Sequence, residues 1–109
     1  MRIFAFRFCR WLRKVQKLPN RAINVVVYKR MDCHLCETAL QMLRKFQHSY
    51  RLAIAEKDIG FDPELLREMG EKIPVIYVEG RERFHGRVNE ALLRRTLAGE
   101  RRRLDRSES

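Results

Sequence analysis

The chain has 109 residues, of which 45% are hydrophobic and 35% charged, and its formal net charge is +10. This length suits one domain with one core, and no apolar run approaches the roughly 20 residues that a membrane-spanning helix needs. The charge is uneven, since residues 1–21 hold seven Arg or Lys and no acid, whereas residues 22–98 hold thirteen basic and eleven acidic residues. The basicity therefore belongs to an appendage, and we expect no specific nucleic-acid partner.

Residues 1–21 are predicted to form a basic amphipathic N-terminal extension. Pro19-Asn20 ends the helical pattern. The large apolar side chains that recur near one face of this helix are Phe4, Phe8, Trp11, Leu12, Val15 and Leu18. Such a helix is suited to binding an anionic membrane or a protein partner, and a flexible extension is the simpler alternative. Arginines interrupt the segment, so it lacks the apolar core of a secretory signal.

Residues 22–98 alternate strand and helix patterns. In chain order we predict a strand at 23–28, a helix at 34–48, a strand at 52–59, a helix from Asp62-Pro63 to Gly70, strands at 75–78 and 82–85, and a helix from Asn89 to Gly99. This β-α-β-α-β-β-α order indicates an α/β domain with a four-stranded mixed sheet whose first two strands are parallel. The first strand is nearly all apolar, which predicts burial on both faces. Residues 99–109 are charged and are predicted to be a flexible tail.

A Cys33-x-x-Cys36 motif follows the first strand and a short polar turn, and it opens the first helix. In this position the motif is typical of a redox dithiol rather than of half a zinc site. Free N–H groups and the helix dipole favour a thiolate at Cys33, and Cys36 lies one turn later, close enough to form a disulfide. A four-ligand zinc site would need a second pair, but Cys9, His48 and His85 are scattered, so we predict no metal.

Three stretches resemble the glutaredoxins, the small form of the thioredoxin fold. Residues 26–36 are similar to their active-site segment, residues 72–75 to the loop that holds a cis-proline, and residues 78–87 to the hairpin and glycine turn. The Cys-His-Leu-Cys sequence resembles the bacterial type of glutaredoxin-like protein. The resemblance implies a thioredoxin-like (glutaredoxin) fold over residues 22–98 and the activity of a thiol–disulfide oxidoreductase.

The resemblance also implies roles for the site residues. Cys33 would be the attacking thiolate, and Cys36 would resolve the mixed disulfide. Arg30 and protonated His34 would place positive charge near the sulfur, whereas Asp32 would disfavour the thiolate. The other expected neighbours of the active site are Ile73 and Pro74.

Departures from the family pattern narrow the chemistry. Glutathione-using members follow the hairpin with Gly-Gly and then Asp, but residues 85–89 here read His-Gly-Arg-Val-Asn. The residues that hold glutathione in those members are therefore missing here. Glutathione and a flavin reductase are the two candidate electron donors, and no bound cofactor is expected. Cys36 stands where iron–sulfur glutaredoxins carry Ser, which favours a dithiol over a cluster carrier. Ala39 stands where the arsenate-reductase relatives carry Arg, which argues against arsenate reduction.

Two functional classes stay open. The first is a disulfide reductase that acts on protein or small-molecule disulfides. The second is a non-catalytic glutaredoxin-like binding module, or a metal- or thiol-binding domain, held on a partner or a membrane by its N-terminal helix. Three cysteines do not suit a secreted disulfide scaffold, so we expect a cytoplasmic protein, and we expect it to act as a monomer.

Overall fold

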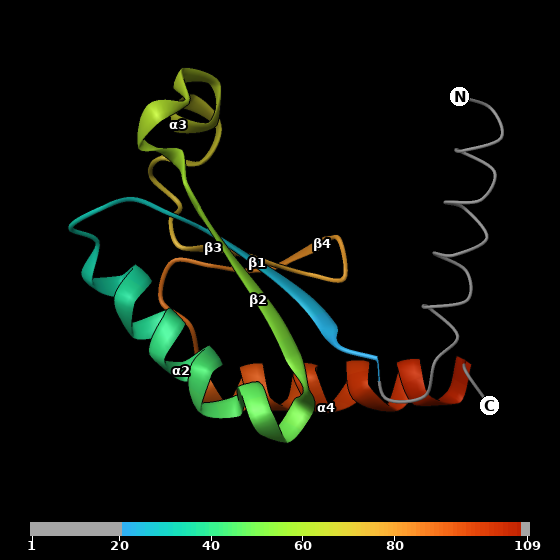
Figure 1. Ribbon diagram of the computed structural model, residues 1–109. Helices are drawn as coiled ribbons and strands as arrows, with labels where there is room; N and C mark the ends of the chain where they lie inside the picture. The colour runs from blue at the N-terminus through green and yellow to red at the C-terminus, as the bar shows by residue number, and fades with distance from the viewer. Residues whose placement is uncertain (1–20, 108–109) are drawn as a thin grey trace, which may run out of the picture.

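The computed structural model describes residues 21–107 and confirms the β-α-β-α-β-β-α order and the four-stranded mixed sheet (Figure 1). The elements are β1 (Ile23–Lys29), α2 (His34–Tyr50), β2 (Leu52–Asp58), a 3₁₀ turn (Ile59–Phe61), α3 (Pro63–Met69), β3 (Val75–Val78), β4 (Arg81–His85) and α4 (Glu90–Ser107). The strand order is β2-β1-β3-β4, and β1 pairs in parallel with β2 and antiparallel with β3. No helix among these residues is long and apolar enough to cross a bilayer. The predicted extension over residues 1–20 lies outside the described residues.

β1 is a central strand, but the prediction that both of its faces are buried is wrong. Ile23, Val25 and Val27 are fully buried against α2 and α4, which lie along one side of the sheet (Figure 1). On the other face Asn24 is exposed and Val26 only half-buried. The short helix α3 packs a second apolar cluster against the end of that face and leaves the rest uncovered.

α2 turns a slightly different face to the core than its sequence pattern predicts. The buried side chains are Cys36, Ala39, Leu40, Leu43 and Phe46. The helical spacing of Leu35, Ala39, Met42, Leu43 and Phe46 predicts that all five share one buried face, but Leu35 and Met42 are only half-buried. This rotation matters for function, because it carries the second cysteine inward and leaves Leu35 and Met42 to line a surface pocket.

α4 extends to Ser107, so the prediction that residues 99–109 are a flexible tail is wrong up to that residue. Leu104 is 1% exposed and joins the main core with Leu93 and Leu97. Glu100 occupies the intervening buried position, where Arg83 and Arg103 pair with its carboxylate at 3.3 and 2.8 Å. Gly99 lies within the helix rather than at its end.

The β3–β4 hairpin holds the start of β1. Glu79 and Gly80 both have positive φ, 50° and 80°, as a two-residue type I′ turn requires. The Glu79 carboxylate accepts the Asn24 backbone N–H at 2.7 Å and pairs with Arg21 at 2.7 Å. Burial raises the pKa of Glu79, but the Arg21 and Asn24 hydrogen bonds lower it more, so its pKa lies below the ordinary value.

Candidate active site

Cys33 is the N-cap residue of α2, and its sulfur takes the place of the usual capping oxygen. Its backbone is extended, with φ −106° and ψ 105°, and it follows Asp32, whose φ of 59° reverses the chain after β1. The Cys33 Sγ accepts the Cys36 backbone N–H at 3.2 Å. The first turn of a helix has N–H groups with no helical partner, so negative charge on this sulfur is stabilised there.

Cys33 and Cys36 are joined by a disulfide, with their Cα atoms 5.2 Å apart. Cys36 is fully buried, whereas Cys33 is partly exposed. A thiol or disulfide from outside therefore reaches Cys33 first. Cys36 lies behind it, on the side of the core, at bonding distance from the same sulfur.

The charged residues predicted beside the cysteines occupy different sides of the helix start. Arg30 and Asp32 are exposed in the turn that leads to Cys33. His34 is also exposed, and its carbonyl oxygen accepts a hydrogen bond from the Thr38 hydroxyl at 3.1 Å. All three predicted side chains are thus at the surface, and all three belong to residues close to Cys33 in the chain.

Ile73 and Pro74 belong to a loop that is hydrogen-bonded to Gly86, just before the segment that faces α2. Their peptide bond is cis, Pro74 is buried, and Ile73 is half-buried in the second apolar cluster. The Gly86 N–H donates to the carbonyl oxygens of Lys72 and Pro74 at 2.8 and 2.9 Å. This link fixes where the chain continues into residues 87–89, opposite the start of α2.

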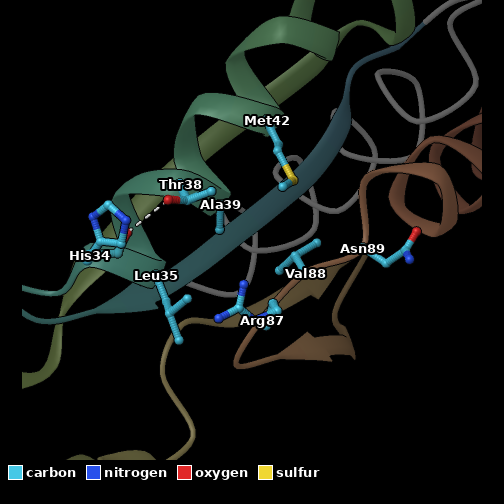
Figure 2. A pocket seen from close by; sticks show the side chains of 8 residues that line it. All are labelled: His34, Leu35, Thr38, Ala39, Met42, Arg87, Val88 and Asn89. Atoms are coloured by element: carbon cyan, nitrogen blue, oxygen red, sulfur yellow. Dashed lines mark hydrogen bonds between the residues drawn. The ribbon is translucent and has the colours of Figure 1, made fainter.

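A pocket of about 470 Å³ lies between α2 and residues 87–89. It is lined by His34, Leu35, Thr38, Ala39, Met42, Arg87, Val88 and Asn89 (Figure 2). In this view Leu35 extends from α2 toward Arg87, whereas the His34 ring points away from it (Figure 2). The volume falls in the range of small-ligand sites. Sequence reasoning missed this pocket because it assigned Leu35 and Met42 to the core.

An ion-pair network contacts the end of β1, just before the turn that leads to Cys33. Lys29 and Arg44 each contact the Glu56 carboxylate at 2.9 Å, which joins β1, α2 and β2. The hydrogen bond with Glu56 raises the pKa of Lys29, and burial lowers it by a smaller amount. The same hydrogen bond from Lys29, assisted by Arg44, lowers the pKa of Glu56. Such exposed pairs contribute little energy each, so the role of this one is positional.

The described residues contain no group of three or more His, Cys, Asp or Glu side chains arranged to hold a metal ion. His48 lies near the far end of α2, and His85 lies at the end of β4, where it faces Glu82 at 3.6 Å. Neither joins the cysteines in a cluster, and Cys9 lies outside the described residues.

The fold and this site define a thioredoxin-fold protein with a Cys-x-x-Cys disulfide at a helix start. More narrowly, the chain belongs to the glutaredoxin-like domain family (DUF836), which matches residues 24–98. The match ends before Glu100 and Leu104, so the last buried turns of α4 lie beyond it.

Solved structures agree with this assignment. The chain is 30% identical to protein XcR50 from X. campestris, with a TM-score of 0.59, and the match covers 69% of this chain and 96% of that one. It is 26% identical to protein Ne2328 from Nitrosomonas europaea, with a TM-score of 0.61 and coverage of 70% and 92%. A chain from a structure on thiol resolution in yeast mitochondrial 1-Cys peroxiredoxin shares the fold, at 15% identity, a TM-score of 0.54 and coverage of 83% and 88%. A comparison with curated proteins gives no match.

Proposed function

We propose that the protein is a thiol–disulfide oxidoreductase in which Cys33 is the nucleophile and Cys36 the resolving thiol. The observation that carries this proposal is the asymmetry of the pair: a partly exposed sulfur at the helix start is bonded to a fully buried one. An inert structural disulfide does not need one sulfur at the surface and on the positive end of a helix. A reactive thiol needs both features.

The reaction begins with the reduced pair. The Cys33 thiolate attacks one sulfur of the substrate disulfide, forms a mixed disulfide and expels a substrate thiolate, which takes a proton from water. Cys36 then loses its proton to water and, as the thiolate, attacks the Cys33 Sγ. The bond between Cys33 and the substrate breaks, and the second substrate thiolate leaves and takes up a proton. Two electrons pass to the substrate, and the 33–36 disulfide remains. An external thiol or a flavin reductase must return these electrons before the next cycle.

Single-cysteine variants test this assignment. All variants carry Cys9→Ser, so that residues 33 and 36 supply the only thiols. With bis(2-hydroxyethyl) disulfide, the Cys36→Ser variant should retain a mixed disulfide at Cys33, visible as one added mercaptoethanol by intact mass. The Cys33→Ser variant should give no adduct at a comparable rate, because its remaining thiol is buried. Equal adduct formation by the two variants would refute the assigned roles.

The electron donor is part of the same proposal. Glutathione is the simplest candidate, although Arg87 and Val88 stand where glutathione-using relatives place other residues. Equilibration of the 33–36 pair in glutathione buffers measures its potential, and members of this fold span about −120 to −270 mV. A value near the reducing end would support a cytoplasmic reductase. A pair that stays oxidised in every glutathione buffer tested would require another donor.

The runner-up function is a binding module that does not turn over. The pocket along α2 favours it, because a cavity of this size beside the cysteines is suited to holding a ligand without any redox step. This function predicts that ligand binding is the same in wild type and in Cys33→Ser. Calorimetry with glutathione, on both proteins, distinguishes the two functions.

A further inference from the structure

A second feature involves the turn that immediately precedes Cys33 and shares no lining residue with the pocket along α2. Among the described residues, three large hydrophobic side chains are exposed: Met31 at 74%, Phe61 at 87% and Leu92 at 48%. Met31 and Phe61 line the same small hollow, together with Arg30, Asp32, Asp58 and Gly60. Single exposed apolar residues are common on protein surfaces, but two that share one hollow beside a reactive sulfur call for a functional explanation.

The sheet register brings these two side chains together from distant parts of the chain. β1 and β2 are parallel, and Lys29 at the end of β1 is opposite Asp58 at the end of β2. The two strands therefore deliver their following loops to the same edge. One loop carries Met31, two residues before Cys33, and the other carries Phe61.

The Phe61 turn is held in place rather than loosely exposed. Ile59, two residues earlier, is fully buried in the second apolar cluster. The Asp58 side chain accepts the Gly60 N–H at 2.8 Å, and the Asp62 N–H donates to the Ile59 carbonyl at 3.1 Å. A turn anchored at both ends thus presents a phenyl ring to water, in the same hollow as Met31 from the turn before Cys33.

We infer that Met31 and Phe61 form a docking surface for protein disulfides, with the hollow taking a large apolar side chain beside the substrate cysteine. This inference rests on the proposed function, whose substrate class it names. The hollow measures about 190 Å³, below the 300–1,000 Å³ typical of small-molecule sites, which suits one side chain better than a whole ligand. Arg30, Asp32 and Asp58 supply the polar rim that surrounds the apolar centre of a protein interface.

Two substrates of different size separate this inference from the proposed function. Reduced protein, freed of reductant, is mixed with excess insulin or with excess bis(2-hydroxyethyl) disulfide, and the loss of its thiols is followed by alkylation and mass analysis. Each reaction is one turnover, so no electron donor is needed. The variants are the double substitution Met31→Ala/Phe61→Ala, the conservative Phe61→Leu, and Leu92→Ala as a matched control on α4, outside the hollow.

The rate of reaction with insulin should fall about tenfold in the double variant. This change is equivalent to about 1.4 kcal/mol, which is the loss expected when one anchoring side chain of an interface is truncated. Its rate with the small disulfide should change by less than about threefold, because that substrate cannot reach both side chains. Phe61→Leu should retain most of the insulin rate, and Leu92→Ala should match wild type with both substrates. Since the truncated side chains are exposed, circular dichroism and thermal unfolding should show that every variant is folded.

Two results would overturn the inference while leaving the proposed function intact: equal slowing with both substrates, or no slowing with either. A wild-type dimer in sedimentation that the double variant abolishes would also overturn it, because the surface would then bind a second copy of the chain. If wild type reduces neither substrate, the proposed function itself fails.

Discussion

Replacing Leu104 with Ala tests whether the last turns of α4, which the sequence pattern did not predict, pack on the domain. Leu104 is 1% exposed and packs in the main core with Leu93 and Leu97. Buried Leu→Ala substitutions cost about 2.7 to 5.0 kcal/mol, depending on how far the cavity collapses. Leu104 lies in the last turns of α4, but Arg101 anchors them by donating to the carbonyl oxygens of Arg21 and Tyr50 at 2.7 and 3.1 Å. Collapse is therefore limited, and we expect a loss in the upper part of this range, about 4 kcal/mol.

Urea unfolding followed by circular dichroism measures this loss as a lower midpoint at an unchanged m-value. Leu92→Ala is the matched control, since it makes the same chemical change on the same helix at a side chain that is 48% exposed. It should cost under about 1 kcal/mol. If Leu104→Ala unfolds within about 0.5 kcal/mol of wild type, residues 99–107 do not pack on the domain, and the flexible tail would be the better description.

Two further predictions concern the same packing and the hairpin. Gly99→Ala should stabilise the protein by about 0.5–1 kcal/mol, because Gly99 is inside α4 and a Cβ there would meet only the end of Arg102 at 3.9 Å. If thermal unfolding shows that the variant is less stable than wild type, α4 is not a continuous helix at this position. The pKa of Glu79 is lowered on folding, so its stabilising effect is complete above the unfolded value of about 4.3 and is lost as the pH falls through the folded value. Glu79→Gln should thus cost about 1 kcal/mol at pH 7 and should flatten the pH dependence of the unfolding free energy below about pH 4.5. An unchanged profile would show that folding does not lower the pKa of Glu79.

The elements that hold the cysteines could be predicted because their signals are local. A run of β-branched residues predicts β1, and a polar turn and an amphipathic pattern place Cys33 at the start of α2. The one-sided burial of β1 could not be predicted in the same way. It depends on how far α3 reaches over the sheet, and α3 has only seven residues.

The end of α4 could not be predicted because its sequence is highly charged. Leu93, Leu97, Glu100 and Leu104 keep helical spacing, but an acid at the third position breaks the apolar pattern. Glu100 is buried because two cations pair with its carboxylate: Arg103, one turn later on α4, and Arg83, seventeen residues away on β4. The partner on β4 is contained in no local pattern, so composition alone favoured a tail.

The site shows the same division between local and long-range information. The proposed reactivity of Cys33 depends on the helix start, on the N–H of Cys36 and on the burial of the second sulfur. The motif, together with the strand, turn and helix patterns around it, is enough to predict the helix start at Cys33. The two surface hollows depend instead on side chains from distant segments, Met31 and Phe61 in one and Leu35 and Arg87 in the other. Each pair meets because the sheet and its loops bring these segments together, so no local sequence pattern contains either hollow.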